Sequence, residues 1–365
     1  MSLVNIQEPM ATQFKSKVFE ITDAHAFMDL AWEKRWTDGL PVLPPTEEKV
    51  GEMLDYMGVD PQKELGAVPP KGGIATYEKV AIQCVMGGCK PEYMPIVVAA
   101  LEAMLEERFN LNGVQCTAHI CAPLTIVSGP AVDTLGFNSS FGLFAGGSRA
   151  NACVGRAVRL ILWNIGGGYT GSPDRSSTGH PGRYTYCIAE NQDGNPWEPL
   201  HVERGFHSEQ TCVTVFAAEA PHFCQYGVTC PPVENLRVMA HTLATLGNNN
   251  IHTQGELMVL LSPGRAEGLA KEKWTKTDVK KYLFDHARLP MRIVRKSPYF
   301  AQSYSHGWWQ KWIDISDDDK MVPLVDRYED IHLVIGGGVG AGAVIPSWGK
   351  FGGFAVTKPV RFPEK

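Results

Sequence analysis

A cysteine in a glycine turn is the first candidate for chemistry. Cys89 follows two glycines and precedes Lys90 and Pro91. We expect a strand over residues 79–86 and a helix from Pro91, which would place the thiol at a helix N-terminus. A helix N-terminus and a nearby lysine both lower the pKa of a thiol, and the thiolate is the reactive form. The pattern predicts a nucleophilic or redox cysteine, and the alternative is a small residue that fills a tight turn.

A histidine beside two cysteines is the first candidate acid–base group. His119 precedes an apolar run, residues 120–127, that is typical of a strand. In an extended segment His119 would share one face with Thr117 and Cys121. Zinc motifs normally come in pairs and this one stands alone, so no metal site is predicted. The alternative for His119 is a histidine of the core.

A second histidine has a carboxylate two residues away. If residues 196–205 are extended, His201 and Glu203 face the same side. Such a pair can share a proton or hold a substrate hydroxyl. The alternative is a salt-bridge patch at an interface.

A Gly- and Ser-rich loop before a helix is the candidate anion site. Ser148 is expected to cap a helix that runs to Trp163. The backbone N–H groups at such a helix start favour an anion, and arginine can bind a carboxylate or phosphate through two hydrogen bonds. A capped helix with surface arginines is the alternative. The candidate anion-binding residues are Asn138, Ser139, Ser148, Arg149 and Arg156.

Elements that could position these residues alternate between helix and strand along the chain. Helices are expected over residues 22–36, 91–108, 148–163 and 233–246, and strands over residues 79–86, 120–127, 184–189, 212–217, 256–261 and 331–335. This order predicts a layered α/β sandwich with a mixed or mainly parallel sheet and ligands bound at strand ends. No dinucleotide or nucleoside-triphosphate motif occurs in the right context, so no cofactor is predicted.

Three strand-to-turn segments resemble one another, at residues 124–130, 258–264 and 333–338. They raise the prospect of two similar halves. We therefore expect an N-terminal arm over residues 1–20, followed by one large α/β domain over residues 21–365. The alternative is two intimate subdomains, at about 21–185 and 186–365.

Composition excludes several classes of protein. The 365 residues carry a net charge of −5 without a basic block, which argues against nucleic acid as a partner. The longest apolar helical stretch, residues 94–105, is too short to cross a bilayer. Residues 1–17 lack the apolar core of a signal peptide. Nine cysteines without a CxxC pair are typical of reduced thiols in the cytoplasm.

Several motifs together resemble a bacterial protein family for which we assign no reaction. They are DGLPVxPPT at residues 38–46, GCxPEYxP at residues 88–95, GP and LGxNS within residues 129–139, and RANA at residues 149–152. The resemblance runs from about residue 20 to the C-terminus. The family is associated with small proteins that carry a UGSC-type selenocysteine or cysteine motif, which is absent from this chain. The resemblance therefore implies a small thiol- or selenol-bearing partner subunit, and an oligomer, homomeric or with that subunit.

These residues predict a cytoplasmic enzyme, or the large subunit of one, that acts on a small anionic metabolite by thiol-dependent chemistry, redox or nucleophilic. Cys89 would supply the thiol and His119 or His201 the acid–base group, with Ser148 and Arg149 as the anion clamp. One alternative is a lyase or hydrolase without a covalent thiol step. Another is a non-catalytic scaffold subunit that binds a small partner protein.

Overall fold

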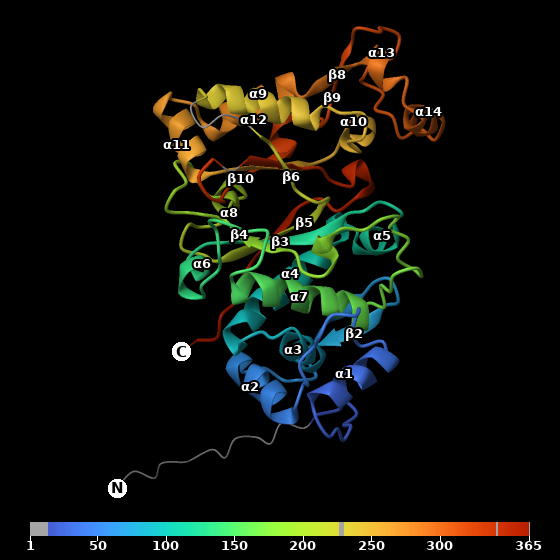
Figure 1. Cartoon of the computed structure of the whole chain (residues 1–365), viewed down its shortest axis with the longest axis vertical. Helices are drawn as coiled ribbons and strands as arrows, with labels where there is room; N and C mark the ends of the chain where they lie inside the picture. The colour runs from blue at the N-terminus through green and yellow to red at the C-terminus, as the bar shows by residue number, and fades with distance from the viewer. Residues whose placement is uncertain (1–13, 226–229, 341, 365) are drawn as a thin grey trace.

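Two four-stranded sheets lie face to face between layers of helices (Figure 1). The computed structural model describes residues 14–225, 230–340 and 342–364. The first sheet has the order β12 (Val356–Pro359), β5 (Cys212–Ala218), β3 (Ala122–Ser128), β4 (Cys187–Ala189). The second has the order β10 (Ile331–Ile335), β7 (Leu257–Leu261), β11 (Gly342–Ile345), β6 (His222–Phe223).

The central strands are apolar on both faces because each sheet is covered on both sides. In β7, Leu257, Val259 and Leu261 pack toward helices, whereas Met258 and Leu260 pack toward the other sheet. This alternation follows the period of two residues in a strand. Continuous apolar runs are typical of strands buried on both faces.

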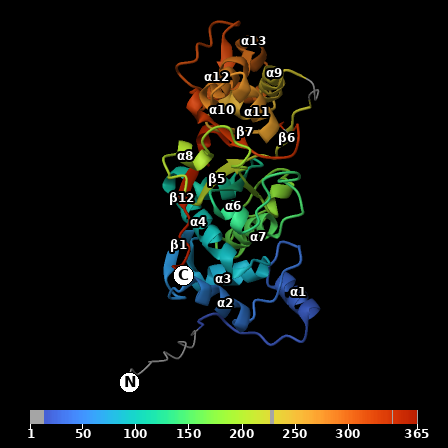
Figure 2. The same cartoon turned by 90° about the vertical axis from the view of Figure 1, so that its left-hand side faces the viewer.

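Helices cover the outer face of each sheet (Figures 1 and 2). The second sheet is covered by α9 (Pro232–Leu243), α11 (Pro263–Lys271) and α12 (Lys276–His286). The first sheet is covered by α4 (Met94–Met104) and α7 (Arg149–Asn164). A further layer beyond these two helices contains α1 (Ala24–Glu33), α2 (Glu47–Met57) and α3 (Tyr77–Met86).

Short elements complete the described part of the chain. The short helices are α5 (Leu111–Cys116), α6 (Ala131–Thr134), α8 (Leu200–Glu203), α10 (Asn250–Thr253), α13 (Met291–Val294) and α14 (Pro298–Ser305). Two small antiparallel pairs join β1 (Glu64–Val68) to β2 (Gly73–Thr76) and β8 (Arg288–Pro290) to β9 (Met321–Pro323). Single 3₁₀ turns are η1 (Pro91–Tyr93), η2 (Glu107–Phe109), η3 (Pro181–Arg183), η4 (Tyr328–Asp330) and η5 (Gly349–Phe351).

The two halves of the chain have the same strand topology. In the first half β3 pairs with β4 in parallel and with β5 antiparallel. In the second half β7 pairs with β10 in parallel and with β11 antiparallel. The next strand of each half joins the sheet of the other half. The strand β6 of the first half pairs with β11, and β12 of the second half pairs with β5. The first repeat therefore runs from β3 to β6 and the second from β7 to β12.

The predicted α/β fold with a mixed sheet is confirmed, whereas a mainly parallel sheet is wrong, because each four-stranded sheet has one parallel and two antiparallel pairs. The strand expected over residues 79–86 is also wrong, because this segment belongs to α3. Thr76 caps α3 by accepting a hydrogen bond from the N–H of Lys79. Val80, Ala81 and Cys84 are buried at helical spacing.

The N-terminal arm is described only from Phe14, and the rest of the predicted arm, residues 1–13, lies outside the described residues. The backbone N–H groups of Lys15 and Ser16 donate to the carboxylate of Glu78 on α3, at 3.1 and 2.8 Å. This part of the arm is therefore bound to the helical layer.

A buried ion pair attaches the proline-rich loop after α1 to α7. Arg156 donates from Nη1 and Nη2 to the two carboxylate oxygens of Asp38, at 2.6 and 2.7 Å. The side chains are 9% and 5% exposed. Removing one partner of such a pair leaves an uncompensated charge in the protein. Two motifs that are 118 residues apart thus depend on each other.

We expect Asp38→Asn to lower the free energy of unfolding by about 3 kcal/mol, because Arg156 would stay buried without its carboxylate. Urea unfolding followed by circular dichroism measures this. Glu267→Gln is the matched control, since Glu267 forms an exposed ion pair with Lys271 on α11 and should change stability by less than about 0.5 kcal/mol. Equal effects of the two substitutions would contradict the role of the buried pair.

Candidate active site

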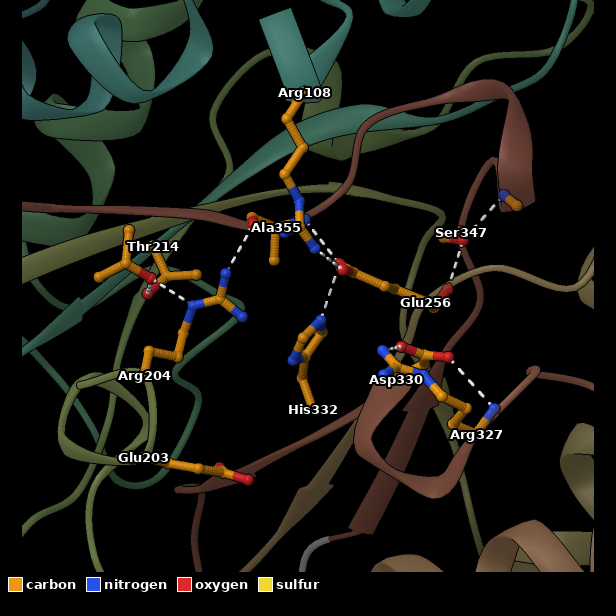
Figure 3. Close-up of polar contacts among 12 residues, drawn as sticks. Arg108, Glu203, Arg204, Thr214, Glu256, Arg327, Asp330, His332, Ser347 and Ala355 are labelled. Atoms are coloured by element: carbon orange, nitrogen blue, oxygen red, sulfur yellow. Dashed lines mark hydrogen bonds and ion pairs between the residues drawn. The ribbon is translucent and has the colours of Figure 1, made fainter. Parts of the chain in front are cut away.

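A charged pocket opens where β7 and β10 begin (Figure 3). Its volume is about 370 Å³, which suits a small molecule. The parallel pairing of β7 and β10 brings the residues before and within these two strands together. The pocket is lined by Arg108, Glu203, Arg204, Phe206, Glu256, Arg327, Glu329, Asp330, His332 and Thr357.

A histidine and a carboxylate form the centre of this pocket. His332 is the second residue of β10, and Glu256 directly precedes β7. His332 Nε2 lies 2.8 Å from Glu256 Oε2, and both side chains are nearly buried. Because a carboxylate can only accept, Nε2 carries the proton. Nδ1 then has no hydrogen bond to any described residue and is not sealed from the pocket, so it is free to take a proton.

Glu256 stays ionised in this position. Burial by itself raises the pKa of its carboxyl, but the charge and hydrogen bond of His332, the N–H of Ala355 and the charge of Arg108 together lower the pKa to about 2. Arg108 Nη2 lies 2.7 Å from Oε1, and Ala355 N lies 2.6 Å from Oε2. A fixed negative charge beside Nε2 stabilises the imidazolium that forms when Nδ1 takes a proton.

Arg204 brings a positive charge that no described carboxylate neutralises directly. Its Nε donates to Thr357 Oγ1 at 2.6 Å, and its Nη2 donates to the carbonyl of Ala355 at 2.6 Å. Both acceptors are neutral oxygens, and they fix the plane of the guanidinium. Nη1 has no hydrogen-bond partner within residues 14–225, 230–340 and 342–364 and is not sealed from solvent. Arg204 can therefore bind an anionic group of a ligand.

Of the predicted catalytic residues, only Glu203 lines this pocket. Lys276 and Lys280 both form ion pairs with its carboxylate. Burial raises the pKa of Glu203, but the charges of the two lysines outweigh burial and lower it. Glu203 therefore holds two lysines and is not a free base.

The predicted pairing of His201 with Glu203 is wrong. Both residues belong to the helical turn α8, not to an extended segment. Residues two apart in a helix point to opposite sides. His201 is completely buried, and burial lowers its pKa.

Cys89 does not lie in the environment that the sequence predicts for a reactive thiol. Because the preceding segment is helical, Cys89 follows the C-terminal end of α3, where its N–H donates to the carbonyl of Cys84 at 2.9 Å. The side chain is 6% exposed, and Sγ donates to the carbonyl of Cys153 at 3.3 Å. Burial and the neighbouring Cys84 raise the pKa of Cys89 well above its ordinary value, although Arg149 acts in the opposite direction.

The loop before α7 has the predicted cap. Ser148 Oγ accepts a hydrogen bond from the N–H of Asn151 at 3.3 Å. Arg149 Nε donates to the carbonyl of Gly88 at 3.1 Å, so Arg149 connects α7 to the turn that carries Cys89. No residue of this loop lines the charged pocket.

Three other candidates for the anion site have internal partners. Arg156 already binds the carboxylate of Asp38 through two hydrogen bonds. The N–H of Asn138 donates to the side chain of Asn151 at 2.7 Å. The carbonyl of Ser139 accepts from the N–H of Gly337 at 2.9 Å and joins this loop to the end of β10.

His119 lies outside the charged pocket. Its Nε2 is 2.8 Å from Glu219 Oε1, and both side chains are 18% exposed. The pair lies between the start of β3 and the end of β5. It resembles the pair of His332 and Glu256 in composition, but it does not line the charged pocket.

Sequence reasoning missed His332, Glu256, Arg204 and Arg108. One signal was available, because His332 interrupts the otherwise apolar strand IHLVI with a polar side chain. A buried polar group needs a hydrogen-bonding partner. The partner, Glu256, is 76 residues away in the sequence, and no local pattern indicates it.

Within the described residues, no three His, Cys, Asp or Glu side chains are grouped in a way that could hold a metal ion. None of the described helices has the length and apolar character that a membrane span requires.

No protein-family model, curated protein or solved structure matches this chain. The resemblance to a bacterial family therefore stays a prediction, as do the partner subunit and the oligomer that it implies. The chemistry of the charged pocket has to follow from its own residues.

We expect Glu256→Gln to cost about 3 kcal/mol of stability at pH 7, since the carboxyl pKa falls from 4.5 in the unfolded chain to about 2 in the folded protein. The wild-type contribution is complete above pH 4.5 and disappears as the pH falls toward 2. Urea unfolding of both proteins between pH 7 and pH 3 measures the difference. A difference that does not shrink with acidification would contradict this assignment.

We expect Cys89 to react slowly with iodoacetamide at pH 7, because burial limits access and raises its pKa. Cys116 and Cys230 are partly exposed and should be labelled first. Peptide mapping of the native protein over time gives the order, with protein unfolded in urea as the control in which all three react. Early labelling of Cys89 would restore the reactive-thiol hypothesis.

Proposed function

We propose that this chain is an enzyme, or the large subunit of one, that transfers a proton on a small anionic metabolite in the charged pocket. The observation that carries the proposal is the open Nδ1 of His332, whose ring is held by Glu256 and lines the same pocket as Arg204 (Figure 3). A general base needs an accessible lone pair, a fixed orientation and a compensating charge. His332 has all three.

The proposed step uses three residues. The anionic group of the substrate binds Arg204, which lies fixed by Thr357 and Ala355. His332 Nδ1 takes a proton from a neighbouring C–H group or hydroxyl of the substrate, and the bonding electrons stay on the substrate. Glu256 offsets the charge of the imidazolium. In a lyase reaction the same proton then returns to the leaving group. In a hydrolase reaction His332 would instead take the proton from a water molecule that attacks the substrate, and would return it to the leaving group.

Acid–base chemistry is favoured over the thiol mechanism expected from the sequence. Cys89 is buried, burial raises its pKa, and no cysteine lines the charged pocket. A thiol with a raised pKa is largely protonated at pH 7 and is a poor nucleophile. The proposal is therefore a lyase or hydrolase without a covalent thiol step.

The pocket favours a compact, polar substrate. Arg108, Arg204 and Arg327 face Glu203, Glu256, Glu329 and Asp330 across about 370 Å³. Charges of both signs suit a molecule that carries an anionic group together with hydroxyl or amino groups. Of the three arginines, Arg108 and Arg327 already form ion pairs with Glu256 and Asp330, which leaves Arg204 to bind the anionic group.

We expect wild-type protein to convert, or to exchange with deuterium, at least one member of a panel of hydroxy acids, oxo acids and amino acids in D₂O. His332→Gln should lower the rate at least 100-fold, because a positioned base contributes about 10² or more. Arg204→Gln should raise KM more than it lowers kcat. Proton NMR of the reaction mixtures measures all three.

His241→Gln is the matched control, since His241 is an exposed residue of α9 outside the pocket. It should leave the rate unchanged. Turnover that persists in His332→Gln would reject the proposal, and so would the absence of turnover with every member of the panel.

A further inference from the structure

A second cavity opens beside the start of β4, in the first half of the chain. It measures about 1040 Å³ and is bounded by the end of α1, by α7 and by residues 169–184. Its wall combines charged residues with four aromatic side chains. The aromatic residues are Trp32, Trp163, Tyr169 and Tyr184.

Arg159 is the unusual residue in this wall. It lies on α7, one turn after Arg156, and is only 7% exposed. It makes no hydrogen bond to any described residue, and its nearest carboxylate oxygen, Asp174 Oδ2, is 4.0 Å from Nη2. Its Nε is buried and has no hydrogen-bond partner. The two terminal nitrogens also have no hydrogen-bond partner among the described residues, but they are accessible from the cavity.

The neighbouring charges leave Arg159 without a counterion. Asp174 is already bound by Arg183, whose Nη2 also donates to the carbonyl of Cys121 at 2.6 Å. Asp38 is bound by Arg156. These three guanidinium groups, all largely buried, therefore share two carboxylates, and Arg159 is the one without a close partner. Burial and the nearby Arg183 lower the pKa of Arg159 to about 10, which still leaves it protonated at pH 7. A buried charge is costly unless an anion pairs with it.

The aromatic residues indicate what the anion is attached to. The guanidinium of Arg159 lies over Trp163, 5.4 Å from the ring centre, and Trp163 meets Tyr169 edge to face at 5.0 Å. Trp32 and Tyr184 are 62% and 47% exposed. Large aromatic side chains that stay exposed around a concave site are suited to contact a planar ring.

We propose that this cavity binds an aromatic monocarboxylate, with the carboxylate on Arg159 and the ring against the aromatic wall. A carboxylate matches the charge of Arg159, which has no close counterion, and its two oxygens match the two open nitrogens of the guanidinium. The site is separate from His332 and does not depend on the proposed reaction. Its position is nevertheless equivalent, because η3 precedes β4 as η4 precedes β10.

Isothermal titration calorimetry with benzoate and benzamide as probes tests this assignment. Wild-type protein should bind benzoate with saturation, and benzamide at least tenfold more weakly, since benzamide has the same shape without the charge. Arg159→Gln should weaken benzoate binding at least tenfold. The matched control is Arg237→Gln, at an exposed arginine of α9 that pairs with Glu234, which should bind benzoate like the wild type.

A second variant keeps the test decisive if Arg159→Gln does not fold. Trp163→Leu retains the charge and removes one aromatic wall, and it should weaken benzoate at least threefold. Equal binding of benzoate and benzamide, unchanged binding in folded Arg159→Gln, or no saturation by benzoate at 10 mM would overturn the proposal. Unchanged benzoate binding in Trp163→Leu would overturn the aromatic part of it. None of these results bears on turnover at His332, so the two proposals can fail separately.

Discussion

Burial of both faces of both sheets is the constraint on which the rest of the structure depends. The central strands have no face available for polar chemistry, so functional side chains must lie where strands begin or end. At the carboxyl ends the loops of the two sheets bind each other, since Gly337 N donates to the carbonyl of Ser139 and Asn191 N donates to that of Ile335. The two charged cavities lie instead beside the amino ends of the parallel strand pairs. In open α/β sheets, ligands usually bind at the carboxyl ends of the strands. Here those ends are occupied by contacts between the loops of the two sheets.

Repetition of one topological unit explains why there are two such cavities. Each half contributes a parallel pair and an antiparallel neighbour, and then donates a strand to the sheet of the other half. This exchange makes the two sheets mutually dependent, because neither is complete without the other half. The equivalent positions carry different side chains. One has a histidine and a glutamate, and the other has an unpaired arginine with aromatic neighbours.

Long-range partners decide which charged residues are free to act. Arg156 and Arg159 lie one turn apart on α7, yet Arg156 is neutralised by Asp38 and Arg159 has no close counterion. Glu203 is likewise occupied by two lysines that come more than 70 residues later in the chain. Burial, not the nearby lysine, dominates the pKa of Cys89. Residue type and spacing alone do not show which of these charged residues has a partner, because the partners come from distant parts of the chain.

The sequence by itself determined the local features of this protein. The apolar strands β3, β5, β7 and β10, the cap Ser148 and the mixed α/β class follow from periodicity and capping, which act over a few residues. Only the tertiary structure decided the exchange of strands, the helical state of α3, and the pairing of His332 with Glu256. Burial and counterions depend on residues that are distant in the chain. Burial and counterions in turn determine which side chains remain accessible to a ligand.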